Sequence, residues 1–179
     1  MGPPIECLAS ALVTIVRPEV PADYDVIRDL HTLAFAGPTE ARLVDRLRGS
    51  SGSISLVAVE AGTVLGHILF TAVNLEGERP AVRVAGLGPM AVSPSRQRSG
   101  IGSALVEQGL EECRRAGYEA VVVVGHPRYY PRLGFRRCSS FGLRCQFDVP
   151  DEVFMAVELN PDVLSGGGEV RYPPEFSEE

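Results

Sequence analysis

The sequence predicts an α/β fold in which helices flank a mixed β-sheet. Residues 54–60 and 63–73 are two apolar, β-branched runs separated by Ala61 and Gly62, which is typical of an antiparallel hairpin. Farther along, a strand, an amphipathic helix and a valine-rich strand follow one another over residues 83–124, and this order predicts a parallel crossover. A hairpin and a crossover combine antiparallel with parallel pairing, so the expected sheet is mixed.

The N-terminal part is expected to hold a short strand and two helices before the hairpin. β-branched residues over 12–16 predict the strand, and Arg17 with Pro18 is expected to end it. Apolar positions recur at helical spacing over residues 22–47, and Gly37 with Pro38 divides that stretch into two helices. After the hairpin, the polar segment 76–80 predicts a turn.

Residues 83–92 form a predicted strand whose regular pairing is interrupted. Gly86, Gly88 and Pro89 fall inside it, and glycine and proline weaken the ladder of hydrogen bonds between strands. The strand is therefore expected to be bulged or to lie exposed at an edge of the sheet.

The second half of the chain alternates helices and strands. An apolar stripe over 101–116 predicts an amphipathic helix that Gly117 ends, and the valines within 119–124 predict a strand covered on both faces. A helical turn distorted by its prolines is expected from Pro127 to just before Gly134, and residues 153–159 form the last clear strand.

The length of 179 residues favours one domain with one sizeable core. We expect an N-terminal leader over 1–10, a single domain over 11–160 and a C-terminal tail over 161–179. Aromatic and proline residues in the tail are expected to pack back onto the domain, namely Tyr172, Pro173, Pro174 and Phe176.

Composition excludes several classes of protein. No apolar run approaches the roughly 18 residues of a membrane helix, and Glu6 stands where a signal peptide carries positive charge, so a cytoplasmic protein is expected. The cysteines form no closely spaced pairs, which predicts free thiols and no metal site. The net charge of −6 argues against nucleic-acid binding. All 17 basic residues are arginines, whose planar guanidinium groups suit phosphate oxygens, although a compositional bias towards arginine is the preferred explanation.

The segment between the irregular strand and its helix carries the most specific signal. Gly100 and Gly102 allow the backbone to approach a bulky anion, and the amides that open the helix point outward with the positive end of its dipole. Arg96 and Arg98 flank these amides. The segment has neither the P-loop pattern nor the third glycine of a dinucleotide fingerprint. Two glycines at a helix start are also common where no ligand binds. The neighbouring elements must therefore indicate whether this segment has a function.

These surroundings resemble the GCN5-related N-acetyltransferase superfamily. Its signature is an irregular strand followed by R/Q-x-x-G-x-G/A at a helix start, which stands here over residues 97–102, and a tyrosine shortly before Gly-Phe, which is Tyr130 before Gly134 and Phe135. Element order matches over 13–159, and motif detail over 87–135. Three further segments look like the uncharacterised bacterial YhbS-like branch, at residues 125–130, 149–152 and 172–176.

The resemblance implies an acyl-CoA N-acyltransferase fold with a central, largely antiparallel mixed sheet and one splayed strand pair. It also implies acetyl-CoA as the acyl donor, a primary amine on a small molecule or protein as the acceptor, and direct attack in a ternary complex. The backbones of Met90 and Val92 would bind the pantetheine arm and the acetyl carbonyl. The pyrophosphate would lie on Gln97, Arg98, Ser99, Gly100, Ile101, Gly102 and Ser103.

Tyr130 corresponds to the family tyrosine that protonates the coenzyme A sulfur, although neighbouring Tyr129 is an alternative. The general base stays open because residues 84–92 contain no acidic side chain. Deprotonation through water is one option, and His126, Glu152 and Glu169 are the others. His126 also stands where many relatives carry an asparagine that touches the coenzyme.

Several features receive no assignment from the sequence. His67 lies in an apolar run whose alternation leaves its direction open, so we assign it no role. An arginine cluster is either a solvated face or a site for the coenzyme 3′-phosphate or an acidic acceptor, and comprises Arg128, Arg132, Arg136, Arg137 and Arg144. The sequence does not identify the acceptor or the length of the acyl chain. It also does not give the oligomeric state, for which a homodimer is one option. A non-catalytic acyl-CoA sensor or scaffold and an unrelated nucleotide-binding protein are the rival hypotheses.

Overall fold

The computed structural model describes residues 13–78 and 81–177, so the expected leader over 1–10 and the end of the predicted turn over 76–80 lie outside it. Its helices are α1 (Tyr24–Ala34), α2 (Thr39–Leu47) and α3 (Ile101–Arg115). Its strands are β1 (Ile15–Pro18), β2 (Ile54–Glu60), β3 (Thr63–Glu76), β4 (Val84–Val92), β5 (Ala120–Val124), β6 (Arg136–Arg137), β7 (Leu143–Cys145), β8 (Phe154–Glu158) and β9 (Gly168–Arg171).

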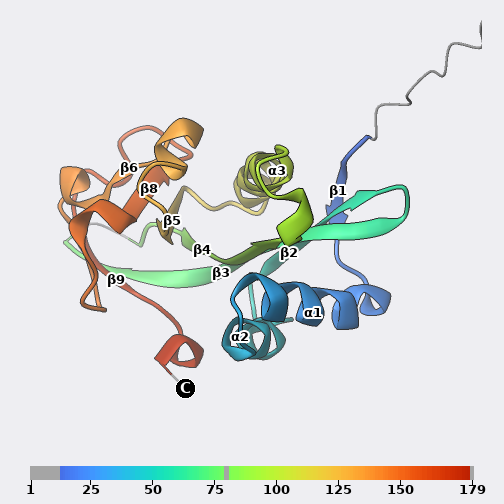
Figure 1. Cartoon of the computed structure of the whole chain (residues 1–179). Helices are drawn as coiled ribbons and strands as arrows, with labels where there is room; N and C mark the ends of the chain where they lie inside the picture. The colour runs from blue at the N-terminus through green and yellow to red at the C-terminus, as the bar shows by residue number, and fades with distance from the viewer. Residues whose placement is uncertain (1–12, 79–80, 178–179) are drawn as a thin grey trace, which may run out of the picture.

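The strands of the described residues form one nine-stranded sheet in the order β1-β2-β3-β4-β5-β8-β6, with β9 pairing both β3 and β7. The β4–β5 and β7–β9 pairs are parallel, and the remaining pairs in this part of the chain are antiparallel. Helix α3 covers one face of the sheet, and α1 with α2 covers the other (Figure 1). The predicted mixed, largely antiparallel sheet flanked by helices is confirmed.

The two N-terminal helices form where the apolar periodicity predicted them, on either side of Gly37 and Pro38. Their buried residues Ile27, Val44 and Leu47 pack on one face of β2 and β3. The first strand differs from its prediction, because β1 extends through Arg17 and Pro18 and pairs with β2. Proline is tolerated there since β1 lies at the edge of the sheet.

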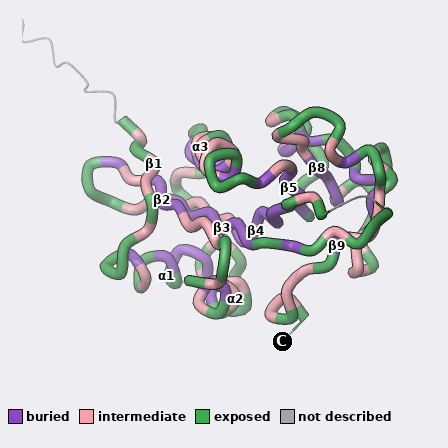
Figure 2. The backbone as a smooth tube through the Cα atoms, turned by 180° about the vertical axis from the view of Figure 1, so that it is seen from behind, coloured by how far each residue is buried: buried purple, intermediate pink, exposed green. Residues whose placement is uncertain are grey.

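Helix α3 builds the core on the opposite face. Ile101, Leu105 and Val106 are at most 1% exposed and lie in one cluster with Phe70 of β3. Figure 2 shows this buried stripe facing the sheet while the outer side of the helix is exposed. The helix ends before Gly117, whose φ of +85° is the left-handed conformation that favours glycine after a helix.

Strand β4 is irregular, and its irregularity opens the sheet. Its register against β3 shifts between Ile68 and Phe70, and the shift falls at the cis Gly88–Pro89 bond. Pairing with β5 covers only residues 84–87 of β4. The predicted bulge is therefore confirmed, whereas the alternative of an exposed edge is wrong, since β4 lies between β3 and β5.

The C-terminal residues contribute more to the sheet than the sequence indicated. Strand β8 lies within the predicted 153–159, but β6, β7 and β9 were not predicted, because so few residues carry little periodicity. Strand β9 pairs with the end of β3, over residues 74–76. From there the tail runs across to the helix pair, where Arg46 of α2 donates a hydrogen bond to the carbonyl oxygen of Glu175.

Candidate active site

The start of α3 is an open anion-binding geometry. Residues 97–100 are exposed, and Gly100 adopts a φ of +88° at the N-cap. No side chain in the described part of the chain caps this helix. The first amides of an α-helix lack partners within the helix, so here they are available to an external acceptor. Gln97 Nε2 donates to the carbonyl of Val92 at 3.3 Å, which ties the loop to the end of β4.

Several predicted coenzyme residues meet at the first turn of α3. A Cβ atom added at Gly102 would lie 2.9 Å from the hydroxyl of Tyr129, 3.7 Å from Val92 Cγ2 and 3.8 Å from Met90 Cε. The hydroxyls of Ser103 and Tyr129 are 3.3 Å apart. The fold therefore brings the end of β4, the glycine loop and the tyrosine segment to one place.

The two arginines beside the loop differ in their surroundings. Arg96 Nη2 lies 2.6 Å from Glu60 Oε2. The sequence did not indicate this ion pair, in which Glu60 neutralises the charge of Arg96. Arg98 is exposed, has a φ of +60° and has no ion-pair partner within residues 13–78 and 81–177. Arg98 is thus the better placed of the two for a phosphate oxygen.

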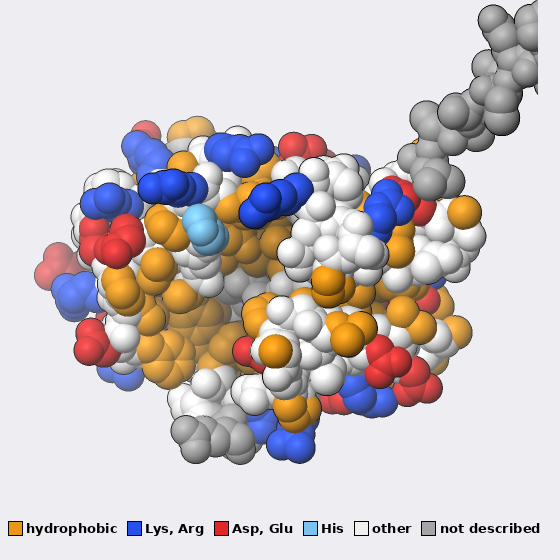
Figure 3. Space-filling model, viewed as in Figure 1, with side chains coloured by type: hydrophobic (Ala, Val, Ile, Leu, Met, Phe, Trp, Pro, Cys, Tyr) orange, Lys and Arg blue, Asp and Glu red, His pale blue; other side chains and the backbone are white. Residues whose placement is uncertain are grey.

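A cavity of about 580 Å³ opens where β4 and β5 separate. Figure 3 shows this face hollowed, with hydrophobic side chains lining the hollow and arginines along its upper rim. One side of the cavity is built from the ends of β4 and β5 and the tyrosine segment, namely Leu87, Gly88, Pro89, Met90, Val123, Val124, Gly125, His126, Tyr129 and Tyr130. The other side comes from α1, α2 and C-terminal segments, namely Phe35, Glu40, Phe147, Val149, Tyr172 and Phe176.

Tyr130 is a buried phenol at the wall of this cavity. Only 6% of the residue is exposed, and its ring packs edge-on to Phe135 at 5.4 Å. Gly125 makes room for it, because a Cβ there would lie 2.3 Å from Tyr130 Cε2. Burial raises the pKa of Tyr130 above its ordinary value, with a smaller contribution from Tyr129, so the hydroxyl stays protonated at neutral pH.

The three candidate general bases have different surroundings in the structure. His126 lines the cavity, but its Nδ1 accepts a hydrogen bond from the backbone amide of Arg128 at 3.3 Å. In a neutral imidazole the other nitrogen then carries the proton, so neither is free to accept another. Glu152 is exposed, Glu169 is paired with Arg171 at 2.6 Å, and neither lines the cavity.

Sequence reasoning missed the residues of the opposite wall. Glu40 lines the cavity from the first turn of α2, and Phe35 from the end of α1. Nothing in the local sequence marks either one, because they reach the cavity only through the packing of the helix pair on the sheet. Tyr172 and Phe176 were expected to pack on the domain, but not to line the site.

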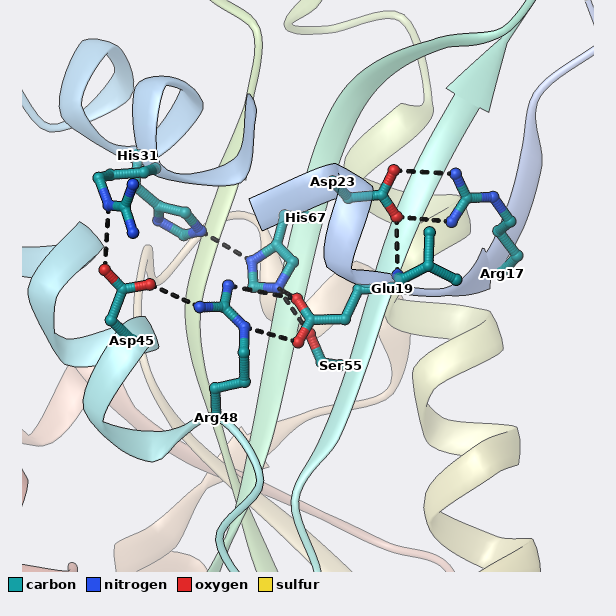
Figure 4. Close-up of polar contacts among 10 residues, drawn as sticks. Arg17, Glu19, Asp23, His31, Asp45, Arg48, Ser55 and His67 are labelled. Atoms are coloured by element: carbon teal, nitrogen blue, oxygen red, sulfur yellow. Dashed lines mark hydrogen bonds and ion pairs between the residues drawn. The ribbon is translucent and has the colours of Figure 1, made fainter. Parts of the chain in front are cut away.

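His67, left without a role by the sequence, belongs to a buried polar network under α1 (Figure 4). Its Nδ1 lies 2.8 Å from His31 Nε2, and its Nε2 lies 2.8 Å from Ser55 Oγ and 3.6 Å from Glu19 Oε2. Arg48 Nε donates to Glu19 at 2.9 Å. Because Nε2 of His67 faces a carboxylate, it carries the proton, and His31 Nε2 must donate to Nδ1.

The network fixes the charges of its members. Burial lowers the pKa of His31 to about 3, and the charges of His67 and Arg48 act in the same direction. Burial likewise lowers the pKa of His67. For Glu19 burial acts in the opposite direction, but hydrogen bonds from His67, Arg48 and Ser55 prevail and lower its pKa to about 2. At neutral pH both histidines are neutral and Glu19 is ionised, so His67 is a structural residue.

Two features are absent from the described residues. These residues contain no group of three or more histidine, cysteine or acidic side chains arranged to hold a metal ion. No helix among them combines the length and apolarity that crossing a membrane requires. Cys113, Cys138 and Cys145 are free thiols, and Cys7 lies outside the described residues.

Comparison with known proteins identifies the class. Residues 24–135 match the model of the acetyltransferase (GNAT) family. The chain is 37% identical over 154 residues to the uncharacterized N-acetyltransferase YjhQ of Escherichia coli K12, covering 81% of this chain and 85% of that protein. It is 33% identical over 166 residues to the uncharacterized N-acetyltransferase YhbS of the same organism, covering 91% and 98%.

Solved structures agree with the sequence relatives. The structure of E. coli YhbS in complex with CoA matches with a TM-score of 0.87 over 94% of each chain. A GNAT family acetyltransferase of Brucella melitensis in complex with acetyl-CoA is 34% identical, with a TM-score of 0.75 over 93% of this chain and 99% of that one. The fold is that of a GNAT acyltransferase. The chain belongs to the GNAT family of N-acetyltransferases, and the predicted likeness to YhbS is confirmed.

Proposed function

We propose that the protein transfers an acetyl group from acetyl-CoA to a primary amine by direct attack in a ternary complex. The observation that carries this proposal is the cavity at the separated ends of β4 and β5, which Tyr130 and Met90 both line. The two relatives with 33% and 34% identity, solved with CoA and with acetyl-CoA, support the choice of donor.

The local geometry supports a donor site at the start of α3. The uncapped first turn of α3 binds the pyrophosphate, with Gln97, Arg98, Ser99, Gly100, Ile101, Gly102 and Ser103 around it. Because β5 stops pairing with β4 after residue 87, the backbone of Met90 and Val92 has no β5 partner and is available to the pantetheine arm and the acetyl carbonyl. The thioester then lies in the cavity beside the tyrosine segment.

In the reaction, the neutral amine attacks the thioester carbonyl carbon to give a tetrahedral intermediate. When this intermediate collapses, the carbonyl re-forms, the C–S bond breaks and its electron pair leaves on sulfur. Tyr130 donates its phenolic proton to the departing thiolate, which suits a hydroxyl that burial keeps protonated. The nitrogen loses its remaining extra proton to give the neutral amide, and that proton restores the phenol of Tyr130 through water. The proton that the ammonium must first lose passes to water, because His126 Nδ1 already accepts from Arg128.

Calorimetry with acetyl-CoA, combined with thiol release in the presence of amines, tests the proposal. Gly102→Glu should abolish acetyl-CoA binding, because it places bulk and negative charge against Met90, Val92 and the phosphates. Gly37→Glu is the matched control, since a Cβ at Gly37 meets nothing within 4 Å, and it should bind normally.

The outcomes separate the rival functions. Unchanged acetyl-CoA affinity of Gly102→Glu would show that the pyrophosphate lies elsewhere. Acetyl-CoA binding without turnover of any primary amine would favour the non-catalytic sensor or scaffold. Binding of NAD or ATP in place of acetyl-CoA would favour a nucleotide-binding protein.

A further inference from the structure

The wall of the cavity that faces the tyrosine segment has a distinct composition. It brings together Phe35 from the end of α1, Phe147 and Val149 from the segment after β7, and Tyr172 with Phe176 from the tail. Among the described residues, Glu40 is the one acidic residue in this lining, and no arginine lines the cavity.

The aromatic residues of this wall form a continuous surface. The ring of Tyr172 lies 5.7 Å from that of Phe147 and 5.0 Å from that of Phe176, each in a tilted arrangement. Phe176 also packs on the core beneath α1 and α2, so the tail is anchored to the helix pair. Aromatic surfaces of this kind bind flat or branched apolar groups and fix their orientation.

Glu40 is the only acidic side chain on the cavity wall within the part of the chain that the structure describes. It is half-buried in the first turn of α2 and has no hydrogen-bond or ion-pair partner within residues 13–78 and 81–177. A carboxylate beside apolar walls favours a cation that forms a charge-assisted hydrogen bond with it. One carboxylate complements one ammonium group, and a second cation would lie against the aromatic wall without a partner.

We propose that the acceptor is a small primary amine with a single positive charge on an aromatic or branched-alkyl body, and that Glu40 binds its ammonium group. This inference rests on the proposed acetyl transfer. The apolar body packs against Tyr172, Phe147 and Phe176, and the amine nitrogen lies between Glu40 and the thioester side of the cavity. Polyamines and aminoglycosides are disfavoured because their additional charges find no carboxylate.

The same arrangement assists product release. Glu40 binds the ammonium form, and the amine becomes a nucleophile after its proton has passed to water. Acetylation turns the nitrogen into a neutral amide, with the carbon–sulfur bond broken and the thiol protonated. The product therefore no longer forms an ion pair with Glu40, and its affinity falls.

A panel of amines with acetyl-CoA, followed by release of the coenzyme A thiol, tests the acceptor class. The panel contains 2-phenylethylamine, isoamylamine, ethanolamine, spermidine and kanamycin. The first two should have kcat/KM values about tenfold or more above the others, as expected for discrimination by an apolar pocket. Acetyl-CoA binding is measured on the same protein by calorimetry.

The role of Glu40 is tested with Glu40→Gln, which keeps the size of the side chain and removes its charge. KM for 2-phenylethylamine should rise about tenfold or more, while the Kd of acetyl-CoA stays unchanged. Glu107→Gln removes an exposed carboxylate of α3 that does not line the cavity and should change neither constant. A lower melting temperature with an unchanged KM would show that Glu40 serves only the α2 dipole, and would overturn its assigned role.

The remaining outcomes distinguish this inference from the proposed function. Preference for spermidine or kanamycin, with normal acetyl-CoA binding, overturns the acceptor class and leaves acetyl transfer standing. Normal acetyl-CoA binding without turnover of either apolar amine also overturns the acceptor class. If the protein does not bind acetyl-CoA, the proposed acetyl transfer is wrong, and the proposed acceptor class is wrong as well.

Discussion

Two adjacent tyrosines at the cavity have different environments. Their rings lie 5.0 Å apart and almost perpendicular, at 84°. Tyr130 is buried against Phe135, whereas the hydroxyl of Tyr129 lies beside Ser103 at the start of α3. This division favours Tyr130 as the proton donor, and a role for Tyr129 in shaping the wall next to the coenzyme.

Tyr130→Phe should lower kcat about 100-fold, because it removes the phenolic proton while keeping the ring and its packing. The Kd of acetyl-CoA should stay within about twofold of the original value, since the ring still fills the same space. Steady-state kinetics and calorimetry measure the two constants.

Tyr129→Phe is the matched control for this prediction. It removes the hydroxyl next to Ser103 and should affect acetyl-CoA binding more than kcat. The reverse pattern, a large fall of kcat in Tyr129→Phe alone, would transfer the acid role to Tyr129.

At the scale of residues, the sequence offered candidates for the donor side but none from the opposite wall of the cavity apart from the tail. Gly100, Gly102 and Tyr130 lie in motifs whose spacing is local, so a single stretch of chain identifies them. Glu40 reaches the cavity only because α2 packs on the sheet, and no local pattern encodes that contact. The pairing of His31 with His67 joins residues on α1 and β3 and was likewise beyond sequence reasoning.

Helix α3 approaches the sheet closely because of one glycine. A Cβ at Gly109 would lie 2.3 Å from Cε2 and 2.4 Å from Cζ of Phe70, whose side chain is fully buried. The ring therefore fills the space that a side chain at position 109 would need, and it sets the spacing between α3 and β3.

Gly109→Ala should lower the free energy of unfolding by about 1–2 kcal/mol. Alanine gains about 1 kcal/mol of helix propensity, but overpacking against the immobile ring costs more. Urea unfolding measures the change. In the control, Gly37→Ala, the new Cβ meets nothing within 4 Å, and the change should stay within about 0.5 kcal/mol. Stabilisation by Gly109→Ala would mean that Phe70 can move away from the helix.

At the scale of elements, the helices and strands that the sequence predicted correctly are the longer ones with regular apolar spacing. The hairpin of β2 and β3, helix α3 and strand β5 lie where apolar periodicity placed them, although β3 extends through Glu76 into the predicted turn. Strands β6, β7 and β9 have at most four residues and were missed. Such short strands form because neighbouring strands offer free edges, which is a property of the tertiary fold.

Across the whole molecule, the His31–His67–Glu19 network couples stability to pH. Both histidines are neutral in the folded protein, with the pKa of His31 lowered to about 3 from its ordinary 6.5. Below pH 6.5 the unfolded chain binds protons that the folded chain does not, so stability falls as the pH falls. Glu19 adds to the loss at lower pH, because the stabilisation from its lowered pKa disappears between its ordinary value of 4.5 and about 2.

His31→Gln should flatten the dependence of stability on pH between 6.5 and 4.5. The amide keeps a donor for His67 but does not titrate, so the loss over this range should shrink by about 2 kcal/mol. Urea unfolding at a series of pH values measures it. His126→Gln, which replaces an exposed histidine outside the network, is the control. An unaltered slope in His31→Gln would mean that this histidine is protonated in the folded protein.

The participation of the tail in the cavity wall has a consequence for biosynthesis. Ribosomes make the chain from its N-terminus, so residues 84–130, which form the donor side, emerge before Tyr172 and Phe176. The pairing of β9 with β3 closes a long loop and forms only after residues 84–130 have emerged. On the proposed function, the coenzyme side therefore emerges before the acceptor wall is complete, and amine selectivity is acquired only when residues 168–176 fold back.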